Sequence, residues 1–216
     1  MIFCRESPDG EEGYPGNLKV QVTISLENSS IILKYHAESD QDTIVNFTNH
    51  SYFNLNGQGT IHEHLLQIRA EQFTVNDMRC LPTGELMAVA GTAMDFRYPC
   101  LIGDGIDKDE ACVKLYGGYD ANYILTGVNP AAVVSSAKSG ISMTMITDQP
   151  GVQLYTANNM PERKGKNGVR YGHRSALCLE TQHYPDCIHH SEWPSCLLRA
   201  GENFDSTTVY AFSTNK

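Results

Sequence analysis

Residues 18 to 26 read L-K-V-Q-V-T-I-S-L, with apolar and polar side chains in strict alternation. Because successive side chains of a β-strand point to opposite faces, this pattern predicts a strand with one buried and one solvated face. Residues 27–30 are turn formers, and residues 31–37 have the apolar and aromatic content of a return strand. With a third strand beginning at residue 44, this part of the chain predicts an antiparallel meander.

Short apolar segments separated by turn residues recur along the remainder of the chain. The predicted strands cover 65–70, 73–75, 91–96, 119–125, 131–135, 141–147, 152–157, 176–182 and 207–212. Clusters of Gly, Pro, Asn and charged residues predict turns or loops at 5–17, 81–84, 103–118 and 158–174. No helical periodicity exceeds a turn or two. The sequence therefore predicts an all-β fold, an antiparallel β-sandwich in which residues 1–216 form one domain.

The composition excludes several classes of partner. The 16 Lys+Arg and 25 Asp+Glu give a net charge of 16 − 25 = −9, which disfavours binding to nucleic acid or to an anionic membrane. The chain has no apolar run long enough to span a bilayer, and its first residues lack the apolar segment of a secretory signal. The 7 cysteines form no C-x-x-C pair, which favours reduced thiols and a cytoplasmic location.

Residues 44 to 56, I-V-N-F-T-N-H-S-Y-F-N-L-N, open as a strand but carry an unusual polar face. Asn46, Thr48, His50 and Tyr52 stand two residues apart, so all four project the same way on an extended backbone. Short hydrogen-bonding side chains with one histidine are typical of the floor of a site for a polyhydroxylated ligand. The same pattern also fits a solvated edge strand with an incidental histidine.

Three further polar residues lie in or beside predicted strands. Glu180 lies on the face of its strand opposite the leucines. Because a carboxylate buried without a partner is costly, Glu180 is either exposed at the strand end or held for a purpose. Asp120 begins a strand and fits an ordinary turn residue, and Gln153 fits an exposed strand residue.

The segment H-Y-P-D-C-I-H-H at 183–190 contains several potential metal ligands. Its spacing is irregular, and the side chains of the adjacent His189 and His190 diverge on an extended backbone, so the pattern argues against a metal site. The sequence also lacks G-x-S-x-G, P-loop and G-x-G-x-x-G motifs. The usual markers of triad hydrolases, kinases and nucleotide-dependent oxidoreductases are therefore missing.

Seven motifs in order along the chain resemble the galactose mutarotase (aldose 1-epimerase) family. They are S-P-D-G-E-E-G-Y-P-G-N-L at 7–18, N-F-T-N-H-S-Y-F-N-L at 46–55, A-G-T-A-M-D-F-R at 90–97, G-Y-D at 118–120, P-G-V-Q-L-Y-T-A-N at 150–158, L-E-T-Q-H-Y-P-D at 179–186 and H-S-E-W-P-S-C-L-L-R-A-G-E at 190–202. The resemblance implies an antiparallel β-sandwich with an open sugar cleft. It also implies interconversion of the α and β anomers of aldohexoses such as galactose and glucose, without a metal or cofactor.

The resemblance further implies an acid–base pair, with His50 matching the family's general acid and Glu180 its general base. The positions that hold the sugar or flank the acid match Asp120, Gln153, Ser51 and Tyr52. Ring opening needs loss of the C1 hydroxyl proton and protonation of the ring oxygen, so we expect acid and base on opposite sides of the anomeric carbon. The expected partner is a small-molecule sugar, and the protein is expected to be a monomer or a weak dimer.

Two departures from the family pattern lead to further expectations. The family carries an Asn-Arg pair and a His-Gly-Gly motif before the S-P-D-G loop, and the given sequence has neither of them before residue 7. In addition, residue 121 is Ala where many relatives have His. We therefore expect a sandwich shortened at its N-terminus, with exposed sheet edges and apolar faces. A catalytically impaired fragment or a sugar-binding β-sandwich without turnover is the alternative function.

The sequence is also compatible with a metal-dependent protein and with a hexose 6-phosphate epimerase. A metal-dependent protein would use the ligands of 183–190. A hexose 6-phosphate epimerase would need an added basic pocket, for which the candidates are Arg163, Lys164, Lys166 and Arg170.

Overall fold

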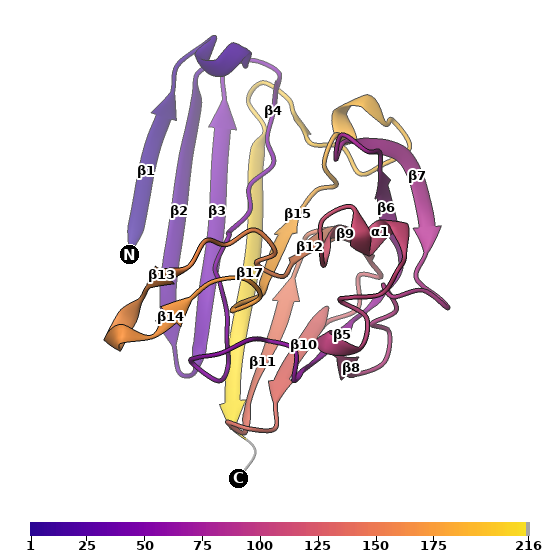
Figure 1. Cartoon of the computed structure of the whole chain (residues 1–216). Coiled ribbons are helices and arrows are strands. Elements are labelled where there is room, and N and C mark those ends of the chain that lie inside the picture. Colours follow the sequence, from indigo (N-terminus) through magenta and orange to yellow (C-terminus); the bar gives the residue numbers. More distant parts are fainter. Residues whose placement is uncertain (215–216) are drawn as a thin grey trace.

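A computed structural model describes residues 1–214, and two antiparallel sheets contain most of the strands (Figure 1). The larger sheet contains, in spatial order, β1 (Ile2–Ser7), β2 (Leu18–Glu27), β3 (Ser30–Ser39), β17 (Asn203–Thr214), β11 (Ile141–Thr147), β10 (Ala132–Ser136), β5 (His64–Ile68) and β8 (Cys100–Leu101). The smaller sheet contains β15 (Cys178–Gln182), β12 (Gly151–Tyr155), β9 (Asp120–Leu125), β6 (Ala70–Asn76) and β7 (Pro82–Ala88). This architecture confirms the predicted all-β, antiparallel fold class.

Two pairs of short strands and a few helical turns complete the fold. The short pairs are β4 (Thr43–Ile44) with β16 (Leu197–Leu198), and β13 (Arg163–Lys164) with β14 (Arg170–Tyr171). The helical elements are α1 (Ala111–Lys114) and the 3-10 turns η1 (Glu11–Gly13), η2 (Ile102–Asp104), η3 (Lys166–Gly168) and η4 (Cys187–His189). None of the helices among the described residues is long and apolar enough to cross a membrane.

The alternating stretch at 18–26 forms the hairpin that the sequence predicts. β2 pairs with β3 over its whole length, from Leu18 opposite Ser39 to Glu27 opposite Ser30. The turn between them places Asn28 at a φ of 53°, a left-handed conformation that asparagine tolerates better than most residues. The second predicted hairpin, 131–135 with 141–147, forms β10 and β11. Local alternation and turn chemistry therefore predict both hairpins.

The predicted meander at the start of the chain is wrong. β3 pairs on its second edge with β17, the last strand of the chain, and not with a strand that starts at residue 44. Residues 5–7, expected in a loop, belong to β1, which pairs residue by residue with 18–23 of β2. Both differences arise because a partner strand supplied from elsewhere in the chain decides whether a short segment joins a sheet.

Two predictions in the middle of the chain are also wrong. The segment 91–96 forms turns instead of a strand, because Gly91 adopts a φ of 76° and the Thr92 hydroxyl donates to the backbone carbonyl of Val89. The turn expected at 81–84 ends earlier than predicted, and its residues from Pro82 onward join β7. β7 borders β6 with a register shift, which accommodates this irregular start.

The core lies between the two sheets. The buried side chains of the larger sheet include Leu66, Ile68, Val134, Met143, Met145 and Tyr210, and those of the smaller sheet include Phe73, Tyr123, Val152, Leu154 and Leu179. In β5, Leu66 and Ile68 are buried while the intervening Gln67 is only half-buried, as the alternation of a strand requires. The same alternation turns Gln153 of β12 and Glu180 of β15 away from the core, toward the opposite face of the smaller sheet.

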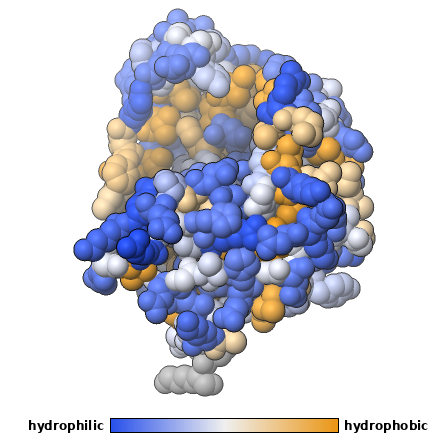
Figure 2. Space-filling model, viewed as in Figure 1, coloured by the Kyte–Doolittle hydropathy of each residue, from blue (hydrophilic) through white to orange (hydrophobic). Residues whose placement is uncertain are grey.

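The free edge at β1 leaves apolar side chains exposed. Met1, Ile2 and Phe3 are 77%, 63% and 53% exposed, and Phe3 lies opposite Val22 of β2. Figure 2 shows a hollow with an apolar floor in the upper part of the same view. The expected exposure of a sheet edge and of apolar surface is therefore present.

Candidate active site

β15 is the last strand of the smaller sheet, yet all five of its residues are buried. Residues 45–56 cover its free edge. At one end Phe53 and Leu177 exchange both backbone hydrogen bonds, at 2.8 and 2.9 Å. At the other end the Asn46 side chain donates to the backbone carbonyl of His183 and accepts from its N–H, both at 3.0 Å. The segment is thus fastened antiparallel to β15 at its two ends.

This arrangement places His50 opposite Glu180. Counting from the bridge between Phe53 and Leu177, His50 is 53 − 50 = 3 residues along one chain and Glu180 is 180 − 177 = 3 residues along the other. Residues at equal distances from an antiparallel bridge face each other, so the side chains of the two residues can meet. Their spacing in the sequence is large, and the two anchors are what bring them together.

The predicted strand in 44–56 is only partly present. Ile44 lies in β4, but no backbone hydrogen bond joins residues 47–52 to β15 in the described part of the chain. The predicted alternation of side chains is nevertheless seen, because Asn46 and His50 are exposed while Val45 is buried. The Asn46 side-chain amide makes the two hydrogen bonds to His183 that a paired backbone would make in a sheet, so Asn46 anchors the segment. Asn46 does not line the cleft, whereas His50 and Tyr52 do.

The acid–base candidates are in direct contact. The His50 Nε2 lies 3.3 Å from the Glu180 Oε1, and the His50 Nδ1 lies 3.3 Å from the Cys178 Sγ. The Glu180 side chain is 10% exposed, whereas the His50 side chain is 50% exposed. Burial raises the pKa of Glu180 to about 6, while the nearby His50 acts to lower it and Asp120 to raise it further. Glu180 is therefore a buried carboxylate in contact with an imidazole, and not an exposed strand-end residue.

The neighbouring strands add a second polar pair on the same face. Gln153 of β12 lies opposite Glu180 of β15, and its Nε2 donates to the Asp120 Oδ1 at 2.7 Å. The Gln153 Oε1 is buried and has no hydrogen-bond partner among the described residues. Burial raises the pKa of Asp120, against the opposing effects of the Gln153 hydrogen bond and of His50. The Gln153 Oε1 is therefore a buried acceptor whose hydrogen-bonding capacity no described group of the chain satisfies.

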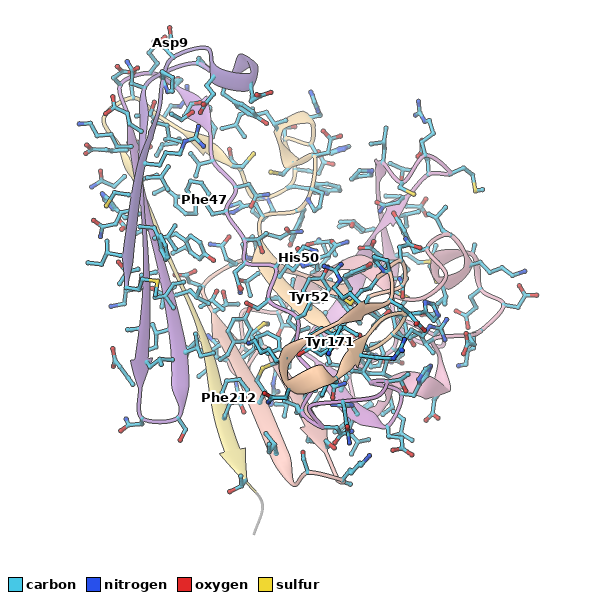
Figure 3. The ribbon with its side chains drawn as sticks, turned by 60° about the vertical axis from the view of Figure 1, so that its left-hand side comes forward. Asp9, Phe47, His50, Tyr52, Tyr171 and Phe212 are labelled. Atoms are coloured by element: carbon cyan, nitrogen blue, oxygen red, sulfur yellow. The ribbon has the colours of Figure 1, made fainter. Side chains whose placement is uncertain are left out.

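These groups line an open polar cleft of about 490 Å³. Two tyrosines form its aromatic wall: the Tyr52 ring stacks on the His50 ring with centroids 4.9 Å apart, and the Tyr155 ring meets the His50 ring edge-on at 5.8 Å. Figure 3 shows His50 and Tyr52 on the segment that runs between the two sheets. Carboxylates, an amide and aromatic faces around one cleft of this size suit a sugar, which offers hydroxyls at its rim and C–H groups on its faces.

The sequence model described as aldose 1-epimerase matches residues 1–211. The chain belongs to the aldose 1-epimerase family. It is 44% identical over 217 residues to the galactose mutarotase of Homo sapiens, covering 98% of this chain and 62% of that protein. It is 36% identical to the aldose 1-epimerase of Escherichia coli K12, covering 98% of this chain and 63% of that protein. The chain thus spans less than two thirds of the length of these curated relatives.

Solved structures of the family share the fold. The GalM/aldose epimerase homologue from C. elegans superposes with a TM-score of 0.89 at 30% identity, covering 100% of this chain and 66% of that one. The galactose 1-epimerase from Lactobacillus acidophilus gives a TM-score of 0.88 at 31% identity, covering 100% of this chain and 63% of that one. The described β-sandwich is therefore the aldose epimerase fold.

Five of the six residues named from the sequence line the polar cleft. They are His50, Tyr52, Asp120, Gln153 and Glu180. Ser51 is not brought into the cleft, because it alternates with His50 and Tyr52, and its hydroxyl donates to the Asn49 Oδ1 at 2.5 Å. Its position next to the acid in the epimerase motif does not give it access to the cleft.

Several lining residues were missed from the sequence. Tyr155 and Gln182 stand two residues after Gln153 and Glu180 on the same strands, so strand alternation was a signal that places them in the cleft. Asn76 and Tyr116 also line it, and the Asn76 Nδ2 donates to the Tyr116 hydroxyl at 2.5 Å. They come from the end of β6 and the loop after α1, and no local pattern indicates that these meet.

The expectation that acid and base stand on opposite sides of the anomeric carbon stays a prediction. His50 and Glu180 lie side by side, in contact. The chemistry favours this geometry, because the C1 hydroxyl and the ring oxygen are bonded to the same carbon. A base for one oxygen and an acid for the second can therefore be neighbours, each within hydrogen-bond reach of its own atom.

Potential metal ligands gather at this pair and not at the histidine-rich segment. One ligand atom each from His50, Cys178 and Glu180 lies within 4.8 Å of the others. In 183–190, Asp186 contacts both His189 and His190, but no group of three ligand-bearing residues converges there in the described part of the chain. A metal at His50 and Glu180 would occupy the lone pairs that proton transfer needs.

Proposed function

We propose that this chain binds an aldohexose in the polar cleft and interconverts its α and β anomers. The observation that carries the proposal is the contact between the exposed His50 imidazole and the buried Glu180 carboxylate, at 3.3 Å in a cleft that also presents Asp120 and Gln153. Membership of the aldose 1-epimerase family supports the same reaction class. Because His50 and Glu180 lie side by side, they can reach the C1 hydroxyl oxygen and the ring oxygen, which are bonded to the same carbon.

The reaction needs two proton transfers in each direction. Glu180 takes the proton of the C1 hydroxyl while His50 gives a proton to the ring oxygen, so the bond between C1 and the ring oxygen breaks and C1 becomes a carbonyl. After rotation about C1–C2, the new hydroxyl attacks the opposite face of C1 and returns its proton to His50. The carbonyl oxygen then recovers the proton from Glu180, and the opposite anomer forms without net consumption of protons.

The environment of each group suits its role. Burial holds the pKa of Glu180 at about 6, so the carboxylate is ionised at neutral pH but is a stronger base than an ordinary glutamate. His50 reaches solvent on one side, which lets it exchange protons. The Asp120–Gln153 pair offers a carboxylate and an unpaired amide oxygen to the hydroxyls of the ring, which orients C1 toward the acid–base pair.

We also propose galactose and glucose as substrates and the cytoplasm as the compartment. Relatives of the chain include galactose mutarotases and a galactose 1-epimerase, by their names. All seven cysteines are free, which fits a reducing compartment.

Polarimetry of freshly dissolved α-D-galactose and α-D-glucose tests the proposal. We expect the approach to equilibrium to be faster than in buffer in proportion to protein concentration, and the acceleration to be lost in His50→Gln and Glu180→Gln. A folded protein that gives no acceleration, yet binds galactose saturably by calorimetry, would establish a sugar-binding β-sandwich without turnover instead. That outcome is a specific alternative, because the chain spans only part of the length of its catalytic relatives.

A further inference from the structure

A second cavity adjoins the polar cleft. Its volume is about 500 Å³, close to that of the cleft, and Tyr52 lines both. We call it the basic pocket, and the residues of its lining that matter here are Tyr52, Met160, Arg163, Lys166 and Tyr171. Figure 3 shows Tyr52 between His50, which lines the cleft, and Tyr171, which lines the pocket. One tyrosine ring therefore forms the partition between the two cavities.

The basic pocket is positively charged in an acidic protein. The whole chain has a net charge of −9, but residues 161–171 contain four cations and one acid, 4 − 1 = +3. The acid, Glu162, pairs with Arg170. Among the described residues no carboxylate lies within ion-pair distance of Arg163 or Lys166. Two cations with no ion-pair partner thus line the pocket.

The β13–β14 hairpin sorts its cations between two faces. Arg163 lies opposite Tyr171, and Lys164 lies opposite Arg170. Since directly opposed residues share a face and successive residues alternate, Arg163 and Tyr171 face the basic pocket while Lys164 and Arg170 face away. The tip of the hairpin packs closely, because a Cβ added at Gly165 would collide with the Tyr171 ring. The hairpin therefore presents one arginine to the pocket in a defined orientation.

The polar cleft has the opposite charge. Two carboxylates, Asp120 and Glu180, line it together with His50. A ligand that carries a negative group is repelled by the carboxylates and attracted by Arg163 and Lys166, so its anionic end is directed across Tyr52. The positive charge of Arg163 already acts on this wall, since burial raises the pKa of Tyr52 and Arg163 opposes that rise.

We propose that the basic pocket binds an anionic group, a phosphate or a carboxylate, carried by the sugar away from C1. Besides neutral hexoses, the site then takes a hexose 6-phosphate or a hexuronic acid, held with its neutral ring in the polar cleft and its anion between Arg163 and Lys166. This inference rests on the proposed function for the placement of C1 beside His50. Arginine and lysine differ in how they hold such a group: the planar guanidinium donates two parallel hydrogen bonds, and the ammonium acts as a point charge.

Calorimetric binding of D-glucose, D-glucose 6-phosphate and D-glucuronate tests the inference. We expect the two anionic sugars to bind at least about tenfold more tightly than glucose at low salt, the gain of roughly one good charge-assisted hydrogen bond. The advantage should shrink as salt is raised, because both cations are exposed. Inorganic phosphate should compete with glucose 6-phosphate and leave glucose binding unchanged.

The hairpin supplies its own matched control. The double variant Arg163→Ala/Lys166→Ala should lose the advantage of the anionic sugars and keep the affinity for glucose within about twofold, since neither side chain lines the cleft. Lys164→Ala/Arg170→Ala removes the same charge from the opposite face of the hairpin and should keep the advantage. Equal losses in both double variants would show a general effect of net charge and overturn the proposal.

Two further outcomes also overturn it. One is equal affinity for all three sugars in the unaltered protein. The second is an equal gain, independent of salt, for an uncharged 6-linked disaccharide such as melibiose, which would mean that the pocket recognises bulk and not charge. These experiments measure binding and not turnover. If the protein did not interconvert anomers, the proposed function would be rejected, but the affinities for the three sugars could still be compared.

Discussion

The two halves of the candidate active site are built in different ways. Glu180 belongs to β15, a strand whose five residues are all buried and whose backbone is paired residue by residue with β12. His50 belongs to a segment whose hydrogen bonds to backbone atoms at the two ends of β15 come from Phe53 and Asn46, and among the described residues 47–52 make no backbone pairing with β15. The carboxylate is therefore positioned by a strand of a sheet. The imidazole is positioned by a segment attached at its two ends, residues 46–53, which we call the span.

This difference separates two requirements of the chemistry. A base with a raised pKa needs burial, which only a packed strand provides. In the proposed reaction His50 regains its proton from the sugar hydroxyl, and the open span leaves half of the imidazole exposed, so that a ligand can reach it. Placing both groups on the same regular sheet would have given them similar burial. The contrast predicts that changes to the buried half affect turnover and pH dependence most, and that changes to the span have smaller effects.

The largest expected effect comes from the buried half. Glu180→Gln keeps the shape of the side chain but cannot accept a proton, so we expect the acceleration of mutarotation to fall by about 10²- to 10⁴-fold. Glu27→Gln, at the exposed end of β2, is the control for loss of one negative charge. Polarimetry at pH 7.5 measures both variants. If Glu180→Gln kept most of the activity, Glu180 would not be the base. The contrast between a buried base and an exposed acid would then also be wrong.

The next effect concerns stability and its dependence on pH. The pKa of Glu180 is raised from 4.5 to about 6, so the folded state binds the proton more tightly than the unfolded chain. The stabilising effect of that proton is therefore fully present below pH 4.5 and is lost as the pH rises through 6, a change of about 2 kcal/mol for a shift of this size.

Urea unfolding at pH 4.5 and pH 7.5 measures this linkage. For each protein, the free energy of unfolding at pH 7.5 is subtracted from that at pH 4.5. This difference should be about 2 kcal/mol larger in the unaltered protein than in Glu180→Gln, because only the unaltered protein carries the ionising group. Activity should fall below about pH 6 for the same reason, as the base becomes protonated. An unchanged difference in Glu180→Gln would mean that the carboxylate is not desolvated.

A third effect tests the span. Asn46→Ala removes both side-chain hydrogen bonds to the backbone of His183, and we expect a loss of about 1–2 kcal/mol in the free energy of unfolding. Because the anchor nearest to His50 at that end is gone, the acceleration should also fall, although Asn46 does not line the cleft. Thr48→Ala, on the same exposed face, is the matched control. Equal small effects in both variants would show that the Asn46 anchor does not position the acid.

The smallest effect concerns Cys178, which joins the two halves. Burial raises the pKa of its thiol, and Glu180 and Asp120 act in the same direction, so the thiol stays protonated at neutral pH, with its Sγ 3.3 Å from the His50 Nδ1. Cys178→Ala should lower the rate by about fivefold, the loss of one hydrogen bond, and should displace the pH–rate profile. Cys178→Ser should restore both. A profile that is unchanged in the alanine variant would assign the thiol to packing alone.

The sequence predicts the buried half better than the span. The strand that contains Glu180 follows from its apolar residues, and the face that it shares with Gln182 follows from alternation. The family motif names His50, yet the sequence does not show that this residue lies opposite Glu180, because that depends on the bridge between Phe53 and Leu177 and on the reach of Asn46. Long-range pairings of this kind leave no local pattern.

The same reason explains why the predicted meander is wrong and why the burial of Glu180 does not follow from the sequence. The pairing of β3 with β17 joins segments from opposite ends of the sequence, and the meander was predicted because nearest neighbours in sequence often pair. Ser51 was included because it adjoins the acid in the motif, although the period of two that selects His50 and Tyr52 excludes it. The buried state of Glu180 comes from the covering span, which no property of its own strand indicates.

The two anchors also constrain the length of the span. Asn46 and Phe53 are 53 − 46 = 7 residues apart, whereas the backbone positions that they grip, Leu177 and His183, are 183 − 177 = 6 apart. The Asn46 side chain bridges the difference of one residue, and His50 lies between the two anchors, where its imidazole meets the Glu180 carboxylate. Deleting one residue between the anchors would shift His50 out of its position opposite Glu180, so an insertion or deletion in this stretch should be tolerated far less than a substitution.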